Sequence, residues 1–287
     1  MITRPIRTYA FLALLVLGAH VNGCSKNVDT SVSSAQQHAP MLAETVAADV
    51  AELRRGLPDG ASHLATLYGS NIAPKDDLAS VRTELERARG KVQDLRVAKS
   101  TFFALAELDG TVLRTDRDPD LMSGKNLFAA YPFLKGTIEG RAAEGLGSMP
   151  EATGVRGRKD VQFAMAVPVK AGGRIVGIYA SGWSMSAYAY RLENALRSEL
   201  RGRIKDEHDK LPLVYVYLVV EDSVYGAPVS PVVNAEAIRK LEPLKKVTGT
   251  AVFTAPLEIE GRDFGLAVRR APSMGANVAV AVLRSET

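Results

Sequence analysis

Cys24 is the only cysteine of the 287-residue chain, and its thiol has the most distinctive chemistry of any side chain in it. Arg4 and Arg7 precede an apolar run at 9–19, and the small residue Gly23 stands directly before the cysteine. A positive start, a short apolar core and a small residue at the cut predict an export signal over residues 1–23. The run of about 11 apolar residues is too short to span a membrane, which takes roughly 20 in a helix. An unpaired thiol in an exported chain invites unwanted pairing, so we expect Cys24 to be modified.

The segment Val21-Asn22-Gly23-Cys24 resembles the lipobox of bacterial lipoproteins. The resemblance implies that Cys24 receives a diacylglyceryl thioether, becomes the first mature residue and is acylated on its amine. Two or more acyl chains anchor a protein stably where one does not. The resemblance also implies a place in the cell envelope, and Ser25, where Asp would retain the protein, favours the outer membrane if the host has one. The alternative is an ordinary signal peptide followed by a stray cysteine.

The remaining reactive residues form no constellation that predicts an enzyme. The segment Gly182-Trp183-Ser184-Met185-Ser186 ends in Ser where a nucleophile elbow needs Gly. His38, His63 and His208 remain after signal cleavage, and their positions have no metal-ligand spacing. The chain also has no P-loop and no dinucleotide fingerprint. We therefore predict no catalytic residue, no metal site and no cofactor.

Two charged segments have weaker binding potential. Asp116, Asp118 and Asp120 alternate, and such carboxylates can bind calcium, but the glycine and glutamate spacing of the EF-hand is missing. We expect them to be exposed loop charges. The basic loop at 156–159 could meet an anion, although a solvated turn is expected there. A formal net charge of +4 is too weak to predict nucleic acid as a partner.

The first part of the mature chain predicts a tether and then helices. Residues 24–40 are polar and aperiodic, which predicts a flexible tether with a solvated His38. Apolar residues from Leu42 to Leu57 recur at three- and four-residue steps and predict a helix, which the sequence Leu57-Pro58-Asp59-Gly60 should end.

A second helix should begin at a cap formed by Asp76 or Asp77 and complete a helical segment over residues 41–100. Its apolar residues form a heptad seam, which consists of Leu78, Val81, Leu85, Ala88, Val92 and Leu95. Two interpretations stay open. The seam packs on its own domain, or it pairs with a second copy in a homodimer.

From Thr101 onward the apolar pattern changes to a period of two, which indicates strands. A hairpin is predicted around Asp109-Gly110, and strands at 161–169 and 174–183 should be joined by the turn at 170–173. Helix is expected at 186–210. A second set follows, with a strand at 214–220, a helix from Asn234 to Leu244 and strands at 250–257, 263–269 and 277–284. These patterns predict a domain at 101–187, a connecting helix at 188–212 and a smaller unit at 213–287.

Three ordered segments carry a family resemblance. They are AKSTFFALAELDGTVLRTDRD at 98–118, LMSGKNLFAAYPFLKGTIEG at 121–140 and VQFAMAVPVKAGGRIVGIYASGW at 161–183. Together they resemble the Cache domain, the PAS-like extracytoplasmic sensor module of bacterial chemoreceptors and sensor kinases. The resemblance implies an α+β fold, with long N-terminal helices, an antiparallel five-stranded sheet with helices on one face, and a second smaller PAS-like unit in a double Cache arrangement.

The same resemblance implies a cleft between sheet and helices that holds a small molecule. In Cache domains the pocket residues follow the second strand and line the last strands, and here those positions offer Arg114, Tyr131, Phe133, Gln162 and Trp183. Arg114 could pair with a carboxylate, the aromatic residues could wall the cleft, and Gln162 could orient a polar group. Each also has a structural alternative: Arg114 pairs with a surface carboxylate, the aromatic side chains fill the core, and Gln162 faces solvent.

Two departures from the family limit the expected function. The Arg-x-Trp signature of the amino-acid-sensing subset does not occur, so the resemblance does not name amino acids as the ligand. The chain also lacks the two membrane helices and the cytoplasmic domain of most Cache sensors. We expect a lipid-anchored, sensor-like protein that binds a small molecule and presents that state to a separate signalling partner. The alternative is a scaffolding envelope lipoprotein that self-associates through its N-terminal helices.

Overall fold

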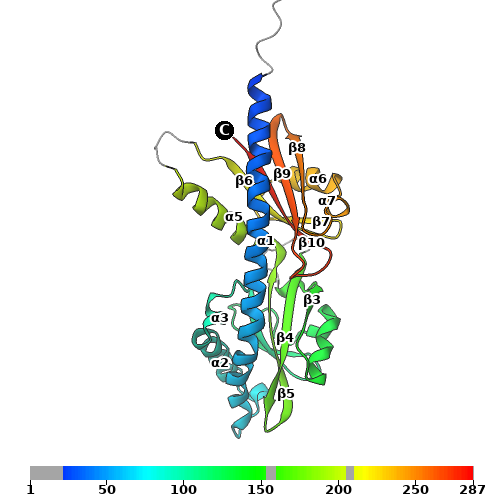
Figure 1. Ribbon diagram of the computed structural model, residues 1–287. Helices are drawn as coiled ribbons and strands as arrows, with labels where there is room; N and C mark the ends of the chain where they lie inside the picture. Colours follow the sequence, from blue (N-terminus) through cyan, green and yellow to red (C-terminus); the bar gives the residue numbers. More distant parts are fainter. Residues whose placement is uncertain (1–21, 153–159, 205–209, 287) are drawn as a thin grey trace, which may run out of the picture.

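The computed structural model describes residues 22–152, 160–204 and 210–286, with side chains from Asn27 onward. The predicted export signal, the Cys24 side chain, the basic loop at 156–159 and His208 lie outside this part of the chain. The described residues form two antiparallel five-stranded sheets along one long helix (Figure 1). None of the described helices combines the length and the apolar character that a membrane span requires.

The two sheets have the same strand order. The first sheet has the order β2-β1-β5-β4-β3, and the second has the order β7-β6-β10-β9-β8. The first consists of β1 (Phe102–Ala106), β2 (Val112–Thr115), β3 (Ala143–Gly147), β4 (Gln162–Ala171) and β5 (Arg174–Ser184). The second consists of β6 (Leu213–Val220), β7 (Ser223–Gly226), β8 (Val252–Ile259), β9 (Arg262–Arg270) and β10 (Val278–Ser285). The predicted strands are confirmed, and β3 and β7 are additional short edge strands; β3 lies where the glycine-rich sequence predicts a loop.

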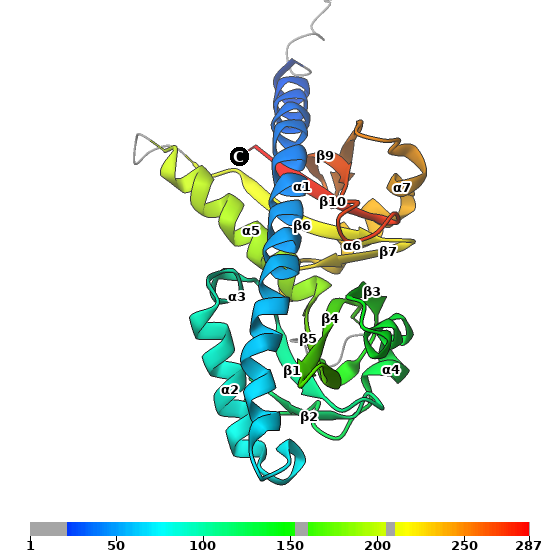
Figure 2. The same cartoon turned by 60° about the horizontal axis from the view of Figure 1, so that its bottom comes forward.

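The helices cover both faces of the sheets. The helices α1 (Asn22–Leu64), α2 (Leu78–Lys91), α3 (Gln93–Val97) and α5 (Met185–Gly202) lie on one side, as Figure 2 shows. On the other side, the first sheet carries α4 (Leu127–Ala130) and the 3-10 helices η3 (Pro132–Glu139) and η4 (Pro150–Ala152). The second sheet carries α6 (Val232–Lys240) and α7 (Pro243–Lys246). Two further 3-10 helices, η1 (Ala65–Gly69) and η2 (Pro74–Asp76), connect α1 to α2.

Helix α1 joins the two sheets into one core. It contacts β8, β9 and β10 of the second sheet and β4 and β5 of the first. Its buried stripe recurs at three- and four-residue steps, as an amphipathic helix requires, and includes Leu42, Val46, Val50, Leu53 and Leu57. The end of β10 lies beside the N-terminal part of α1, where the Glu286 amide donates to Ser31 Oγ at 3.1 Å. The two ends of the described chain therefore lie at the same end of the molecule (Figure 1).

The predicted tether at 24–40 is wrong, because these residues form the first turns of α1. Ser31, Ala35 and Ala39 are buried one helical turn apart, and their small side chains let the strands approach the helix closely. A Cβ at Gly265 of β9 would lie 2.2 Å from the Val32 nitrogen, so only glycine permits this contact. The segment is aperiodic in hydropathy because its buried residues are small.

Two related predictions about α1 are also wrong. His38 is buried rather than solvated, and burial, together with Arg284, lowers its pKa. The helix does not end at Leu57-Pro58-Asp59-Gly60 but continues through Pro58 to Leu64. Proline lacks the backbone donor of a helix interior, yet Leu57, Ala61 and Leu64 remain buried beyond this point, and their packing sustains the helix.

The heptad seam packs within its own chain. Val81, Leu85, Ala88 and Leu95 are buried, and α2 and α3 contact α1. The predicted cap is Asp77, whose carboxylate accepts from the Ser80 amide at 3.1 Å. The seam is therefore an internal contact of the helical layer that covers the first sheet.

Candidate functional site

The segments that carry the predicted ligand residues Tyr131 and Phe133 cover the face of the first sheet that points away from α1. We call the space between this face and its covering segments the first-sheet interior. Small strand residues such as Ala104, Ala164 and Ala180 form its floor. Larger buried side chains from the covering segments fill it; they are Met122, Leu127, Phe128, Tyr131, Leu134 and Met149. The covering segments therefore supply the bulk that the strands lack.

Tyr131 and Gln162 lie together in this interior and form a hydrogen bond with each other. Both are fully buried, and Tyr131 Oη donates to Gln162 Oε1 at 2.9 Å. The same oxygen accepts from the Met149 amide at 2.7 Å, and Gln162 Nε2 donates to the Asp160 carbonyl at 3.1 Å. Gln162 is thus paired through both atoms of its amide, and it pins η4 and β4 together. Burial raises the pKa of the Tyr131 hydroxyl, so it stays a neutral donor.

The carboxylate of Asp160 organises the start of α5. It accepts a short hydrogen bond from Ser184 Oγ and a bond from the Ser186 amide at 3.3 Å. Ser184 is in turn the N-cap of α5 and accepts from the Ala187 amide at 3.3 Å. Burial raises the pKa of Asp160, while these hydrogen bonds favour its charged form. This network ties the first sheet to the helix that leads to the second sheet.

Trp183 lies on the opposite face of the sheet from Gln162. Gln162 pairs with Ser184, so the neighbouring Trp183 points the other way, toward α1. Its ring lies 4.8 Å from that of Tyr188 and 5.1 Å from that of Phe163. The Tyr188 hydroxyl donates to Asp49 of α1 at 2.6 Å. Trp183 therefore belongs to the contact between the first sheet and α1.

The structure also separates Arg114 from the Tyr131–Gln162 pair. Arg114 lies on β2, which is three strands from β4, a separation of about 14 Å at about 4.8 Å per strand. Its guanidinium pairs with Asp120 at 3.4 Å. Phe133 is half-buried and packs on Tyr131, with ring centroids 6.1 Å apart. Of the five predicted ligand residues, the structure thus brings together Tyr131, Phe133 and Gln162.

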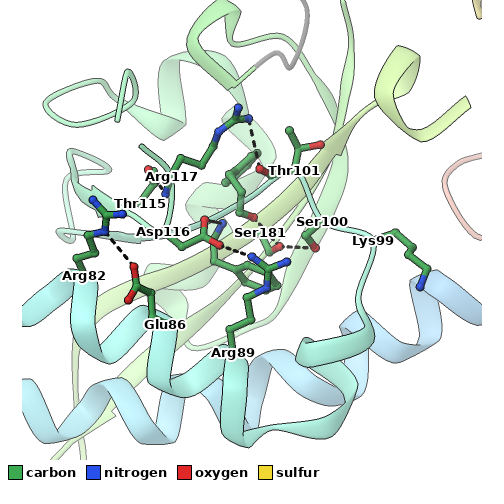
Figure 3. A network of polar contacts seen from close by, with 12 residues as sticks. Arg82, Glu86, Arg89, Lys99, Ser100, Thr101, Thr115, Asp116, Arg117 and Ser181 are labelled. Atoms are coloured by element: carbon green, nitrogen blue, oxygen red, sulfur yellow. Dashed lines mark hydrogen bonds and ion pairs between the residues drawn. The ribbon is translucent and has the colours of Figure 1, made fainter. Parts of the chain in front are cut away.

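The aspartates at 116 and 120 are buried, so their predicted exposure is wrong, whereas Asp118 is exposed as predicted. The Asp116 carboxylate accepts from the Phe103 amide and from Arg89 of α2, both at 2.8 Å (Figure 3). Burial raises the pKa of Asp116 even though Arg89 opposes the rise. Figure 3 shows that this contact ties α2 to the sheet. Within the described residues, no group of three or more His, Cys, Asp or Glu could hold a metal ion.

The first-sheet interior is closed by its own side chains. Five cavities along the described residues are lined by none of the predicted ligand residues. One of them, of about 540 Å³, lies against β6, β7 and α6 of the second sheet, with Tyr217 and Ser230 among its lining residues. The sequence analysis missed these residues. An available signal was Asn234, a polar residue that is buried inside α6, although the sequence predicts it at the start of a helix.

Comparison with known proteins identifies chains of similar fold. The ligand-binding domain of the Pseudomonas aeruginosa amino acid chemoreceptor PctC, solved in complex with GABA, has a TM-score of 0.50 at 15% identity, over 87% of this chain and 97% of that chain. The ligand-binding domain of the Pseudomonas fluorescens chemoreceptor CtaA, solved in complex with L-isoleucine, has a TM-score of 0.50 at 14% identity, over 93% of this chain and 96% of that chain.

A longer protein gives a similar score. An extracellular ligand-binding receptor from Desulfohalobium retbaense has a TM-score of 0.52 at 15% identity, and the match covers 86% of this chain but 40% of that chain. No protein-family model and no curated protein matches the sequence. At these identities the likeness is one of fold. The chain has the α+β fold of Cache-like sensory domains, with a long N-terminal helix and two antiparallel five-stranded sheets.

Proposed function

We propose that this protein is a lipid-anchored, extracytoplasmic receptor that binds a small molecule and passes its state to a partner. The observation that carries the proposal is the course of α1, which packs against both sheets in turn. A change in either sheet acts directly on this helix. The comparison proteins PctC and CtaA, whose fold is the same, are ligand-binding domains of chemoreceptors. Fold likeness alone does not fix function, so the proposal needs a binding measurement.

The experiment is a thermal-shift screen of the full mature chain in detergent against organic acids, amines and nucleobases. A ligand at 100 times its Kd stabilises the folded state by about 2.7 kcal/mol, which is a clear rise in Tm. We expect at least one compound class to produce this rise in a saturable way. Unchanged melting across the whole library would contradict the proposal.

Lipid anchoring is the second part of the proposal. Cys24 lies at the N-terminal end of α1, the end where the second sheet packs. Acylation there would hold the second sheet near the membrane and the first sheet away from it. Intact-mass measurement of protein purified from membranes should give a chain that begins at Cys24 and carries acyl groups. A mature chain with an underivatised Cys24 would contradict the anchor.

A scaffold that self-associates through its N-terminal helices has less support. The seam residues that would mediate assembly, including Val81, Leu85 and Leu95, are buried in their own chain. The proposed ligand role of Tyr131, Phe133 and Gln162 is tested in the same screen with a Gln162→Ala variant, and that of Arg114 and Trp183, which lie elsewhere, with Arg114→Ala and Trp183→Ala. If the ligand binds in the first-sheet interior, the Gln162→Ala variant should lose the shift.

A further inference from the structure

We propose that the second sheet carries a binding site for a small carboxylate with an apolar body, in the cavity between β6, β7, α6 and the start of α5. We call this space the second-sheet cavity. The inference rests on the proposed receptor function and assigns it a place and a ligand chemistry. The cavity holds about 540 Å³, within the range of roughly 300–1,000 Å³ that small-molecule sites occupy.

Buried polar atoms without a well-formed hydrogen bond lie at this cavity. Tyr217 Oη, Ser230 Oγ and Asn234 Nδ2 have no partner of good hydrogen-bond geometry among the described residues, although they lie near enough to interact weakly with one another. The three residues are 0%, 8% and 3% exposed. Buried polar atoms in native proteins almost always have a partner, and an unsatisfied one costs about 1–3 kcal/mol. Tyr217 and Ser230 line the cavity and Asn234 lies beside Tyr217, so a ligand in the cavity can complete the hydrogen bonds of this group.

Asn234 and Ser230 lie close to the Tyr217 hydroxyl. Burial raises the pKa of the Tyr217 hydroxyl, and Asn234 and Ser230 lie close enough to offset part of that rise. Gly226 makes this arrangement sterically feasible, because a Cβ there would lie 2.5 Å from the Tyr217 ring. The ring of Tyr217 therefore packs directly against Gly226 of β7.

The chemistry of the site favours an acceptor that carries negative charge. Asn234 Nδ2 is a donor only, and the two hydroxyls can both donate. Arg239 is the charged residue among the described lining, and it forms no ion pair with a described carboxylate. A carboxylate group would accept from these donors and meet the positive charge, which is the strongest pairing that they offer.

The walls of the cavity favour an apolar body on that carboxylate. Beyond its polar groups, its lining is largely apolar or aromatic and includes Val224, Tyr225, Ala227, Pro231, Val232 and Ala235. Val232 is 54% exposed, so the rim offers apolar surface that a ligand would cover. Covering apolar surface contributes about 25 cal/mol per Å², which adds affinity to the polar contacts. Benzoate and hexanoate are therefore the probes of choice.

The test is isothermal titration calorimetry of benzoate and hexanoate against the full mature chain in detergent. We expect saturable binding of at least one of these carboxylates, and binding of benzamide, the neutral analogue of benzoate, that is weaker by about tenfold or more. Asn234→Ala and Arg239→Gln should each raise the Kd by about tenfold or more. Lys240→Gln is the matched control, because Lys240 neighbours Arg239 on α6 but does not line the cavity.

The outcomes separate this inference from the receptor function. No saturable binding of either carboxylate, or equal affinities in the wild type and the two cavity variants, would overturn the second-sheet site. If the broader screen still finds a ligand whose binding depends on Gln162, the receptor function stands and its site lies in the first sheet. If the screen finds no ligand at all, the receptor function fails as well. Circular dichroism melting of each variant shows whether it folds, and Ser230→Ala provides a milder cavity variant.

Discussion

The two sheets have the same strand order but differ in how polar groups are paired on their faces that point away from α1. In the first sheet, Gln162 has a partner for each of its amide atoms, and Tyr131 donates to it. In the second sheet, Tyr217 and Asn234 are equally buried, and Tyr217 Oη and Asn234 Nδ2 have no partner of good hydrogen-bond geometry among the described residues. The comparison teaches that two sheets of the same strand order can differ in whether the polar groups buried under their covering helices pair with one another.

Helix α1 also meets the two sheets through different chemistry. At the first sheet it offers Asp49 to the hydroxyl of Tyr188, which stacks on Trp183. At the second sheet it offers small side chains and a buried His38, and Gly265 of β9 lies directly against its backbone. The first contact depends on a hydrogen bond to a carboxylate, and the second depends on close packing.

Removal of the Trp183 side chain should have the largest effect. Trp183 is fully buried between Phe163 and Tyr188, so Trp183→Ala should lower the free energy of unfolding by about 4 kcal/mol. Urea denaturation measures this loss, and Tyr190→Ala, at an exposed position of α5, is the control. A loss smaller than about 1 kcal/mol would show that Trp183 is not part of the core. Benzoate affinity should stay unchanged in any variant that folds.

Gln162→Leu should break the polar network that closes the first-sheet interior. The change leaves the Tyr131 hydroxyl and the Met149 amide without their acceptor, and the unfolding free energy should fall by about 3 kcal/mol. The double variant with Tyr131→Phe should lose less than the sum of the single variants, because the two residues share a hydrogen bond. Gln93→Leu, at an exposed position, serves as the control. Strict additivity would contradict the described pairing.

The contact of α1 with the first sheet should depend on pH through Asp49. Burial raises the pKa of this carboxyl above 3.8, against the effects of Tyr188, Lys99 and Arg191. Protonation of Asp49 therefore stabilises the folded state relative to the unfolded state, and this contribution is lost as pH rises through the folded pKa. Relative to Asp49→Asn, the wild type should be most stable below about pH 4 and should lose stability as the pH rises above that value. Urea denaturation of the wild type and Asp49→Asn across this pH range measures the difference in their unfolding free energies. Asp59→Asn, at an exposed position, is the control. A wild type that gained stability relative to Asp49→Asn as the pH rose would contradict the raised pKa of Asp49.

The contact of α1 with the second sheet should show the opposite dependence through His38. Burial and Arg284 lower the pKa of the imidazole below 6.5, with a further contribution from Arg203 against Glu199 and Glu286. The neutral form is favoured in the folded state, so this contribution is present above about pH 6.5 and is lost as pH falls. Compared with His38→Gln, the wild type should lose stability below that pH. If the wild type instead gained stability relative to His38→Gln as the pH fell below about 6.5, His38 would be charged in the folded protein.

Ser230→Ala should have the smallest effect, and it should be stabilising. The hydroxyl of Ser230 is buried without a partner of good hydrogen-bond geometry among the described residues, so its removal should raise the unfolding free energy by up to about 1 kcal/mol in the absence of ligand. Ser184→Ala, which removes a paired hydroxyl in the first sheet, should instead destabilise. Thermal melts of the two variants compare the sheets directly. Equal destabilisation by Ser230→Ala and Ser184→Ala would contradict the contrast between the two sheets.

The strands and hairpins could be predicted from the sequence because their signals are local. The turn at Gly172 and Gly173 has both residues at positive φ, which glycine accommodates freely, and alternation marks the strands on either side. Edge strand β7 was not predicted from the sequence, because it has only four residues and follows a turn in which Glu221 adopts a positive φ. No composition signal marks such a turn.

The site could be predicted less well, because it depends on register and on small residues. Gln162 and Trp183 were expected to line one cleft, but the pairing of Gln162 with Ser184 turns Trp183 to the other face. A single sequence does not reveal that pairing. The first turns of α1 were hidden for a related reason, since Ser31 and Ala35 are buried by virtue of their small size rather than their hydropathy. Unpaired polar atoms such as those of Tyr217 become visible only once the chain is folded.

The most direct test of the contrast between the two sheets is hydrogen–deuterium exchange of the full mature chain with and without saturating benzoate. We predict slower exchange in β7 and in the first turns of α6, which border the second-sheet cavity, and unchanged exchange in η3 and β3 of the first sheet. Protection confined to η3 and β3, with none at the second-sheet cavity, would contradict the account.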